Sequence, residues 1–165
     1  MTTTSRPPRS CGFTLVEMMV VVAIIGLVTA AALPAIKRMY LLSRANVMAN
    51  DLRVYATAFL NYTENDDDYP KDSGTGKFPK GMDGYLRDSW LEPTPIGGYY
   101  NYEYNKKAQG TRYTAGIGIR SKGKEKVTTD ADLLLAIDRK IDDGNLKTGS
   151  FLLGPGNAPF YVIEP

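Results

Sequence analysis

The sequence contains no histidine and only one cysteine among its 165 residues. Without an imidazole the chain cannot form a Ser-His-Asp or Cys-His hydrolase site, a histidine-ligated zinc site or a histidine proton shuttle. A single cysteine excludes an intrachain disulfide and a cysteine cluster. Basic residues exceed acidic ones by only 20 to 18, and this net charge of +2 does not by itself indicate a nucleic-acid partner.

Charge is nearly absent from one long stretch near the N-terminus. From Phe13 to Leu33 the only ionisable residue is Glu17, and most of the others are Val, Ala, Ile, Leu or Met. As a helix this stretch would be about 30 Å long, which is the thickness of a bilayer core. Arg6 and Arg9 precede it, so the positive-inside rule predicts a cytoplasmic N-terminus with the rest of the chain across the membrane. The alternative is a cleaved secretory signal peptide, but the apolar run is longer than such signals.

The junction before this stretch combines a small residue, an aromatic residue and a carboxylate, in the order Gly12-Phe13-Thr14-Leu15-Val16-Glu17. Together with the short basic leader and the apolar run, it resembles the processing site of type IV pilins and type II secretion pseudopilins. The resemblance covers roughly residues 9–40. It implies a leader peptide at 1–12, cleavage by prepilin peptidase between Gly12 and Phe13, and N-methylation of Phe13. It also implies a helix kink at Pro34.

Glu17 can be interpreted without the resemblance. A carboxylate in a bilayer core costs several kcal/mol, so it usually has a partner. After cleavage the nearest candidate is the α-amine of Phe13, from the same chain or from a neighbouring subunit. The resemblance implies the second arrangement, which sets the axial register during filament assembly. The alternative is that the Glu17 side chain reaches the cytoplasmic headgroups.

After Pro34 the helix is predicted to become amphipathic. Apolar residues recur at spacings of three and four, and the other faces carry charged and amide side chains. The resulting apolar stripe consists of Leu41, Ala45, Met48, Leu52, Tyr55 and Phe59. We therefore expect a transmembrane and filament-core helix at 13–34 that continues as an amphipathic helix at 35–62. Two separate helices, broken at Pro34, are the alternative.

Residues 63–165 are predicted to form a globular α+β head in the periplasm. Tyrosines at alternate positions of 98–104 and apolar residues on one parity of 111–120 predict an antiparallel hairpin with a loop at 105–110. A helix is expected over 129–140, with short strands near 150–153 and 160–163. The expected fold is a small antiparallel sheet packed against the long N-terminal helix, with Trp90 in the core.

Three aspartates surround a glycine turn at the end of the helix expected in the head. Asp138, Asp142 and Asp143 supply hard oxygen donors, which are typical of Ca²⁺ ligands, so calcium is the candidate cofactor. The spacing differs from that of an EF-hand, and Arg139 and Lys140 oppose a cation. An Asp-Gly turn after a helix explains the same residues without a metal. No other cofactor is predicted.

Two further segments of the head allow a ligand-binding interpretation. The alternate tyrosines suit a stacking platform for carbohydrate or single-stranded nucleic acid, but sheet packing explains them as well. The basic segment 120–126 suits anionic lipid or DNA, and a solvated loop is the alternative. No nucleic-acid partner is predicted. The chain has no phosphate-binding glycine loop, nucleophile elbow or zinc box, so an enzyme is not predicted either.

Two functions agree with these patterns. The first is a structural subunit that is inserted in the bacterial inner membrane, processed, and polymerised on an inner-membrane assembly platform. It would form a pilus or a secretion pseudopilus with copies of itself or with other pilin-like subunits. The second is a single-pass, membrane-anchored periplasmic binding module that does not polymerise. A simple anchor needs neither a processing junction nor Glu17, which favours the first. By the resemblance, a head without cysteine favours a type II secretion pseudopilin over a disulfide-closed major pilin.

Overall fold

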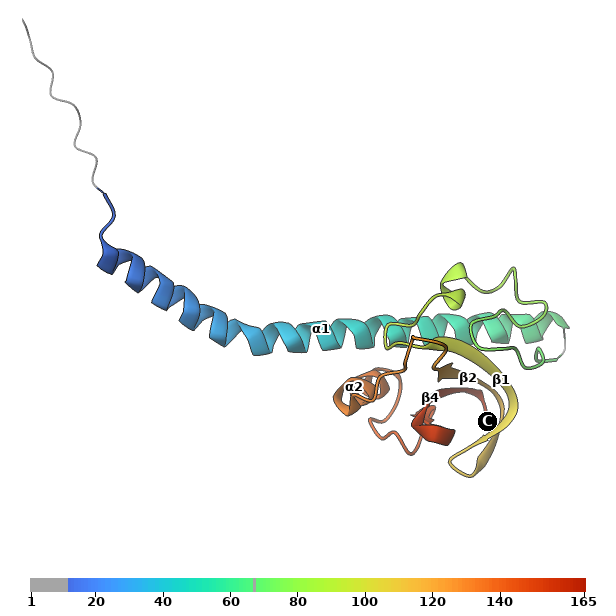
Figure 1. The fold of residues 1–165 in the computed structure, drawn as a ribbon. Coiled ribbons are helices and arrows are strands. Elements are labelled where there is room, and N and C mark those ends of the chain that lie inside the picture. Colours follow the sequence, from blue (N-terminus) through green and yellow to red (C-terminus); the bar gives the residue numbers. More distant parts are fainter. Residues whose placement is uncertain (1–11, 67) are drawn as a thin grey trace, which may run out of the picture. The chain divides into compact units, whose positions relative to one another are not determined.

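A computed structural model of the chain describes residues 12–66 and 68–165. The chain divides into two units, Met1–Met39 and Tyr40–Pro165, and the first helix contributes to both. The predicted leader, apart from Gly12, lies outside the described residues. Along the chain the elements are α1 (Leu15–Asp66), the 3₁₀ helix η1 (Asp88–Leu91), β1 (Tyr99–Ala108), β2 (Thr111–Arg120), α2 (Ala131–Ile141), β3 (Phe151–Leu153), the 3₁₀ helix η2 (Pro155–Asn157) and β4 (Pro159–Glu164) (Figure 1).

The described part of the first unit consists of the beginning of α1 and the residues just before it. Its most apolar window has a mean hydropathy of 2.6 and buries none of its residues, and the helix is long and apolar enough to cross a membrane. The helix continues through Pro34 without interruption. Because α1 is one helix from Leu15 to Asp66, the alternative of two separate helices broken at Pro34 is wrong. The kink at Pro34 stays a prediction.

In the second unit, α1 buries the predicted apolar stripe. Of its members, only Leu41 is partly exposed, and the rest are fully buried: Ala45, Met48, Leu52, Tyr55 and Phe59. The sheet lies along this side of the helix (Figure 1). All its strands are antiparallel, in the order β1-β2-β4-β3. The predicted α+β fold, with a long N-terminal helix against a small antiparallel sheet, is confirmed.

Five aromatic side chains connect α1, η1 and β1, and we refer to them as the aromatic cluster: Tyr55, Phe59, Trp90, Tyr100 and Tyr102. Tyr55 meets Trp90 edge to face, with ring centroids 5.0 Å apart. Phe59 stacks on Tyr102 at 4.3 Å, and Trp90 stacks on Tyr100 at 5.2 Å. Such pairs contribute beyond the apolar area that they bury. The predicted core position of Trp90 is confirmed.

Most polar atoms of the aromatic cluster have partners. The indole N–H of Trp90 donates to the carbonyl of Lys77 at 2.9 Å, and the hydroxyl of Tyr100 donates to Asp51 at 3.1 Å. The hydroxyl of Tyr102 has none within the part of the chain that the structure describes. Burial raises the pKa of both Tyr100 and Tyr102 above the ordinary value of 10.0, so both side chains stay neutral.

The β1–β2 hairpin is tighter than predicted. Instead of a loop over 105–110, β1 extends to Ala108 and the turn consists of Gln109 and Gly110 alone. Their φ angles of +49° and +84° are both left-handed, as in the two-residue turns whose twist matches that of the flanking strands. Glutamine seldom adopts a positive φ, so the sequence carries no sign of a two-residue turn at Gln109 and Gly110, and a longer loop was predicted.

Replacing Phe59 by alanine tests the aromatic cluster. Because Phe59 is fully buried against Tyr102, we expect the free energy of unfolding of the head to fall by about 3–5 kcal/mol. The measurement is urea denaturation of the full chain in a non-ionic detergent, followed by near-UV circular dichroism. Leu60→Ala is the matched control, because Leu60 is the next residue and is 41% exposed. Equal losses in the two variants would contradict the packing described here.

Candidate functional site

Thr14 and Glu17 close the start of α1 with reciprocal hydrogen bonds. The backbone N–H of Glu17 donates to the Thr14 hydroxyl at 3.2 Å, and the N–H of Thr14 donates to the Glu17 carboxylate at 3.4 Å. Since α1 begins at Leu15, Thr14 is the N-cap residue and Glu17 the third residue of the helix. This arrangement is a capping box. The carboxylate also interacts favourably with the positive end of the helix dipole.

The capping box was not predicted, although the pattern Thr-x-x-Glu before an apolar run indicates it. It gives Glu17 a local structural role and turns its carboxylate back toward the predicted cleavage junction. Phe13, on the other side of that junction from Gly12, is 73% exposed. A methyl group added at Gly12 would meet no atom within 4 Å, so packing within the described chain does not require glycine there.

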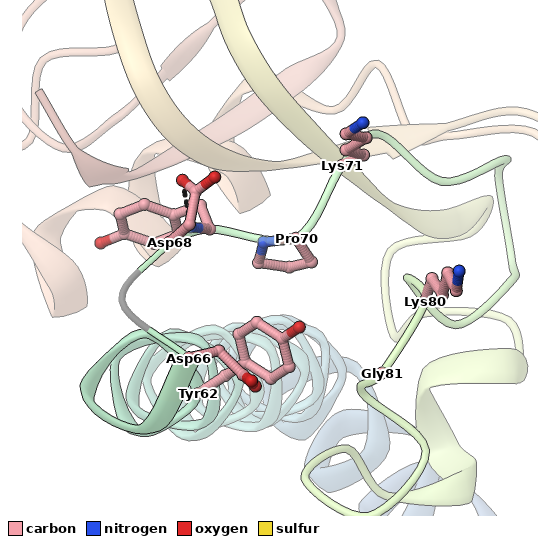
Figure 2. Close-up of a pocket in the computed structure, with 8 residues that line it drawn as sticks. Tyr62, Asp66, Asp68, Pro70, Lys71, Lys80 and Gly81 are labelled. Carbon is pink, nitrogen blue, oxygen red and sulfur yellow. Dashed lines mark hydrogen bonds between the residues drawn. The ribbon is translucent and has the colours of Figure 1, made fainter.

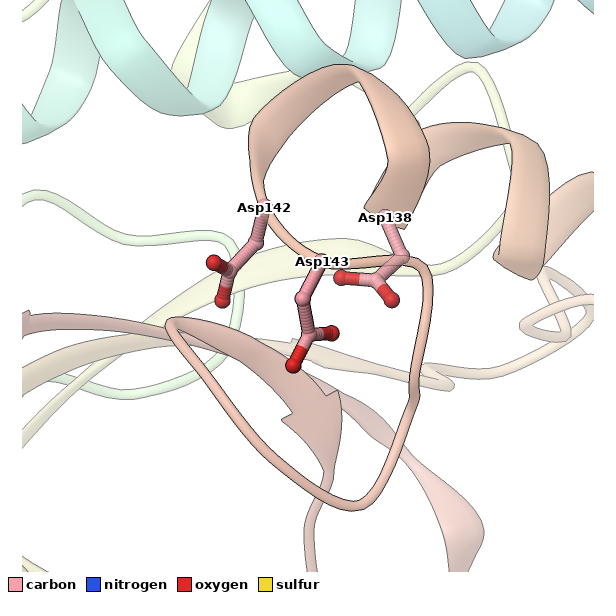
Figure 3. Close-up of side chains that lie close together, drawn as sticks. All are labelled: Asp138, Asp142 and Asp143. Atoms are coloured by element: carbon pink, nitrogen blue, oxygen red, sulfur yellow. The ribbon is translucent and has the colours of Figure 1, made fainter.

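A second group of acidic side chains lies at the end of α2. Asp138 belongs to the helix, whereas Asp142 and Asp143 follow directly after it. The structure brings all three together, with one carboxylate oxygen of each within 4.8 Å of the others. Figure 3 shows the carboxylates side by side, facing the loop that leads to β3. These are the three residues that the sequence singles out as candidate Ca²⁺ ligands.

Asp138 is fully buried, and neither of its carboxylate oxygens has a hydrogen-bond partner within the described residues. Burial raises the pKa of Asp138 to about 6, and the charges of Asp143 and Asp142 add to the rise, while the backbone N–H groups of Gly144 and Asn145 oppose it. Its burial was not predicted. The signal was that it stands on the apolar stripe of α2, four residues after Leu134 and next to Ile137.

Asp142 and Asp143 are exposed and organise the loop after α2. The Asp142 carboxylate accepts a hydrogen bond from the N–H of Ser150. The Asp143 carboxylate accepts from the N–H of Asn145 at 2.8 Å and from the hydroxyl of Thr148 at 2.7 Å. The glycine after Asp143 has a φ of +82°, so the Asp-Gly turn given as the metal-free explanation is present. That turn explains Asp142 and Asp143 but not the burial of Asp138.

A pocket of about 440 Å³ lies at the C-terminal end of α1 (Figure 2). Its four charged side chains, two carboxylates and two ammonium groups, are all exposed. The lining includes no thiol, hydroxyl nucleophile of serine or threonine, or imidazole, so it offers no nucleophile–base pair of the hydrolase kind. The lining residues are Tyr62, Asp66, Asp68, Tyr69, Pro70, Lys71, Lys80 and Gly81.

The sequence suggested two ligand-binding surfaces, the alternate tyrosines and the basic segment 120–126, and the structure argues against the first only. Tyr100 and Tyr102 are buried in the aromatic cluster, so they do not form an exposed stacking platform. The basic segment 120–126 contacts the head through Lys122, which donates to the carbonyl of Thr75 at 3.0 Å. Its other lysines are exposed. That no nucleic acid binds this segment stays a prediction.

Two comparisons with known proteins give a match. Residues 7–33 match the family model described as the prokaryotic N-terminal methylation motif. The fold is similar to that of the major type IV pilin PilA1 from Clostridium difficile, with a TM-score of 0.53 and 16% identity, over 76% of this chain and 97% of that one. The fold is type IV pilin-like. No curated protein matches its sequence.

The matched methylation motif contains the processing junction and both members of the capping box. The structural similarity concerns the fold of the pilin-like chain and adds nothing about its partners. The motif and the fold together support a pilin-type subunit with an N-terminal helix that suits membrane anchoring.

Replacing Thr14 by alanine tests the capping box. Losing an N-cap hydroxyl costs about 0.5–2 kcal/mol, so amide hydrogen exchange at Glu17 and Met18 is expected to accelerate by a factor of about 2–30. The measurement is exchange by NMR on the full chain in detergent micelles. Thr29→Ala is the control, because the Thr29 hydroxyl donates to the carbonyl of Ile25 within the helix. Unchanged exchange in Thr14→Ala would show that the cap does not hold the first turn.

Proposed function

We propose that this pilin-like chain is a structural subunit of a filament, either a type II secretion pseudopilus or a type IV pilus. The precursor is inserted in the bacterial inner membrane with its N-terminus in the cytoplasm and its head in the periplasm. Prepilin peptidase cuts between Gly12 and Phe13, and Phe13 is N-methylated. The N-terminal helix then polymerises with copies of the chain or other pilin-like subunits on the assembly platform. The carrying observation is a capped carboxylate, Glu17, in the first turn of α1, where it is the one charge in the apolar stretch inside the methylation motif.

The apolar side chains at the start of α1 are not covered by the described residues of the first unit. The large ones between Phe13 and Val28 are between 42% and 76% exposed. Exposing apolar area to water costs about 25 cal/mol per Å². In the proposal, lipid tails cover these side chains before assembly and the helices of neighbouring subunits cover them afterwards. The role is therefore structural, and no catalytic step is assigned to the chain.

The capping box directs the Glu17 carboxylate toward the end of the helix that carries the predicted cleavage site. Cleavage would create a positively charged α-amine on Phe13. A hydrogen bond from an ammonium group to a carboxylate is stronger than the one from the neutral Thr14 N–H. The amine of a neighbouring subunit can therefore join the hydrogen bonding at Glu17, neutralise its charge and fix the axial position of that subunit.

The surroundings of Gly12 indicate that the glycine is required by a processing enzyme and not by packing within the chain. Gly12 is exposed, and a Cβ atom added in its place would meet no described atom within 4 Å. A peptidase that needs a small residue before the scissile bond supplies the missing reason. The head contains no cysteine, which supports the pseudopilus form of the proposal over a disulfide-closed major pilin.

Processing can be tested on protein purified from its host. We expect mass spectrometry of the N-terminal peptide to show N-methylated Phe13 as the first residue. Gly12→Leu is expected to retain the leader, because the larger side chain blocks the peptidase, whereas a Cβ at this position meets no described atom of the chain within 4 Å. Gly26→Ala is the control, since a methyl group at Gly26 also meets nothing within 4 Å. An intact Met1, or a cut near Ala32, in the unmodified protein would contradict the proposal.

Assembly can be separated from helix capping by replacing Glu17 with glutamine. Glutamine can take the place of glutamate in a capping box but carries no charge. We expect Glu17→Gln to be inserted and cleaved normally, while the yield of sheared filaments falls at least about tenfold, as for the loss of about 1.4 kcal/mol at each contact. Glu17→Ala removes both the cap and the charge. If Gln assembled like the unmodified chain and only Ala failed, Glu17 would serve capping alone.

A further inference from the structure

We propose that the pocket at the C-terminal end of α1 binds a short peptide with free termini. Two aspartates, Asp66 and Asp68, face the ammonium group of the peptide, and two lysines, Lys71 and Lys80, face its carboxylate. All the residues that line the pocket belong to the second unit. Binding is therefore a property of the head and does not depend on whether the chain polymerises.

The four charged side chains of the pocket have no ionic partners in the described structure. The ion pairs found among the described residues do not involve any residue that lines the pocket. Figure 2 shows Asp66 and Asp68 toward one side of the pocket and both lysines toward the other. The opposite charges are therefore too far apart to pair directly, and a ligand that carries both charges can bridge them.

The balance of charges favours a ligand with both signs. Two carboxylates and two ammonium groups sum to zero, so a simple anion at the lysines is repelled by the aspartates. A simple cation at the aspartates is repelled by the lysines in the same way. A zwitterion instead forms charge-assisted hydrogen bonds on both sides, and such complementarity determines which partner fits.

The end of α1 strengthens the side that receives the ammonium group. Asp66 is the last residue of the helix, and no basic residue stands in the last turn. The helix dipole is negative at this end and the last carbonyls have no partner within the helix, which favours a cation. Burial and then the charge of Asp66 raise the pKa of Tyr62, and the charge of Asp68 adds to the rise. Both carboxylates therefore act near one aromatic ring, which can itself bind an ammonium group.

The aromatic walls of the pocket, Tyr62 and Tyr69, are fixed by the head. Both side chains are partly buried against the core. The ring of Tyr62 meets that of Tyr85 edge to face, with centroids 5.5 Å apart. Burial and the nearby carboxylate of Glu164 in β4 raise the pKa of Tyr69, so its hydroxyl stays neutral. Walls that are already ordered cost little entropy when a ligand binds, and an apolar side chain of the peptide can pack on them.

The backbone is anchored on both sides of Lys71. The preceding residue, Pro70, is buried. The carboxylate of the following residue, Asp72, accepts a hydrogen bond from the N–H of Tyr104 and forms an ion pair with Lys106 at 2.6 Å. The exposed Lys71 side chain therefore starts from a fixed position beside the cavity.

Gly81 brings the second lysine to the pocket. Its φ is +88°, and a Cβ in its place would lie 3.0 Å from the hydroxyl oxygen of Tyr62 and 3.2 Å from a ring carbon. The left-handed backbone and the close approach both require glycine here. Lys80 is thereby held near the aromatic wall, and the fully buried Met82 fixes the chain just beyond it.

The size of the cavity suits a short peptide better than a single amino acid. Its volume of about 440 Å³ lies in the range of about 300–1,000 Å³ that is usual for small-molecule sites. An extended chain advances about 3.3–3.6 Å per residue, so the charged termini of a dipeptide are about twice as far apart as those of one amino acid. Because the opposite charges of the pocket do not pair across it, the wider separation fits.

The test uses the full chain in a non-ionic detergent at low salt and about pH 6.5, where both termini of a peptide are charged. The probe is the dipeptide alanyl-phenylalanine, and NMR follows the backbone amides of Lys71 and Gly81. Binding is expected with a Kd of roughly 0.1–1 mM. The N-acetylated and the C-amidated dipeptide each lack one charge, and each should bind at least about tenfold more weakly. Glycerophosphoethanolamine has both charges but no side chain to pack on the tyrosines, and it should also bind more weakly.

Two variants assign the charges to the two sides. Asp66→Asn should weaken binding of the dipeptide about tenfold or more, but it should not further weaken binding of the N-acetylated form. Lys80→Gln should act in the same way on the dipeptide and its C-amidated form. Asp83→Asn and Lys107→Gln are the controls, because both residues are exposed and lie outside the lining. All four positions are exposed, so near-UV circular dichroism should show an unchanged head.

Three results would overturn the proposal. The first is unchanged amide shifts at about 10 mM dipeptide, which is at least ten times the expected Kd. The second is equal affinity for the dipeptide and its acetylated and amidated forms, because the charges of the pocket would then play no part. The third is equal affinity for glycerophosphoethanolamine, which would contradict a peptide as the ligand. None of these results bears on methylation of Phe13 or on filament yield, so the proposed function is decided separately.

Discussion

The packing of Tyr55 and Phe59 against Trp90, Tyr100 and Tyr102 is the interaction on which the head depends. Each large aromatic side chain buries about 150–250 Å² of surface, and these five come from α1, η1 and β1. They join the second half of α1 to the sheet without a disulfide, which one cysteine cannot form. The position of β1 in turn sets that of β2, and β2 pairs with β4. The aromatic cluster therefore connects one face of α1 to the sheet through β1, and strand pairing connects the rest of the sheet.

That helix has to satisfy two different environments. In its first half the side chains are apolar on every face and exposed, and in its second half only one face is apolar and buried. The change of pattern is visible in the sequence because a helix that faces lipid or other helices needs no polar side, whereas one that faces a core and water does. This is why the helix, its stripe and the alternating strands could all be predicted from periodicity.

The details that were not predicted depend on single residues in special surroundings. The turn at Gln109 and Gly110 uses a left-handed glutamine, which turn preferences disfavour. The capping box lies inside the matched methylation motif, close to the processing junction, so one stretch of sequence carries two signals. The burial of Asp138 contradicts the usual exposure of aspartate, and only its place on the apolar stripe of α2 indicated it. Hydrophobic periodicity indicates which face of a helix or strand is buried. The turn, the capping box and the burial of Asp138 depend instead on individual hydrogen bonds and neighbouring side chains.

Glu17 and Asp138 show how the same chemical group is treated at opposite ends of a helix. Glu17 stands in the first turn of α1, where a backbone N–H donates to it and the helix dipole is positive. Its charge is partly compensated within the chain, so an amine from a neighbour can add to an arrangement that already exists. Asp138 stands in the last turn of α2, without a hydrogen bond in the described residues, beside two further carboxylates and at the negative end of the dipole. Burial and the charges of Asp143 and Asp142 together raise the pKa of Asp138. The local surroundings therefore favour the charged form of a carboxylate in the first turn of α1 and disfavour it in the last turn of α2.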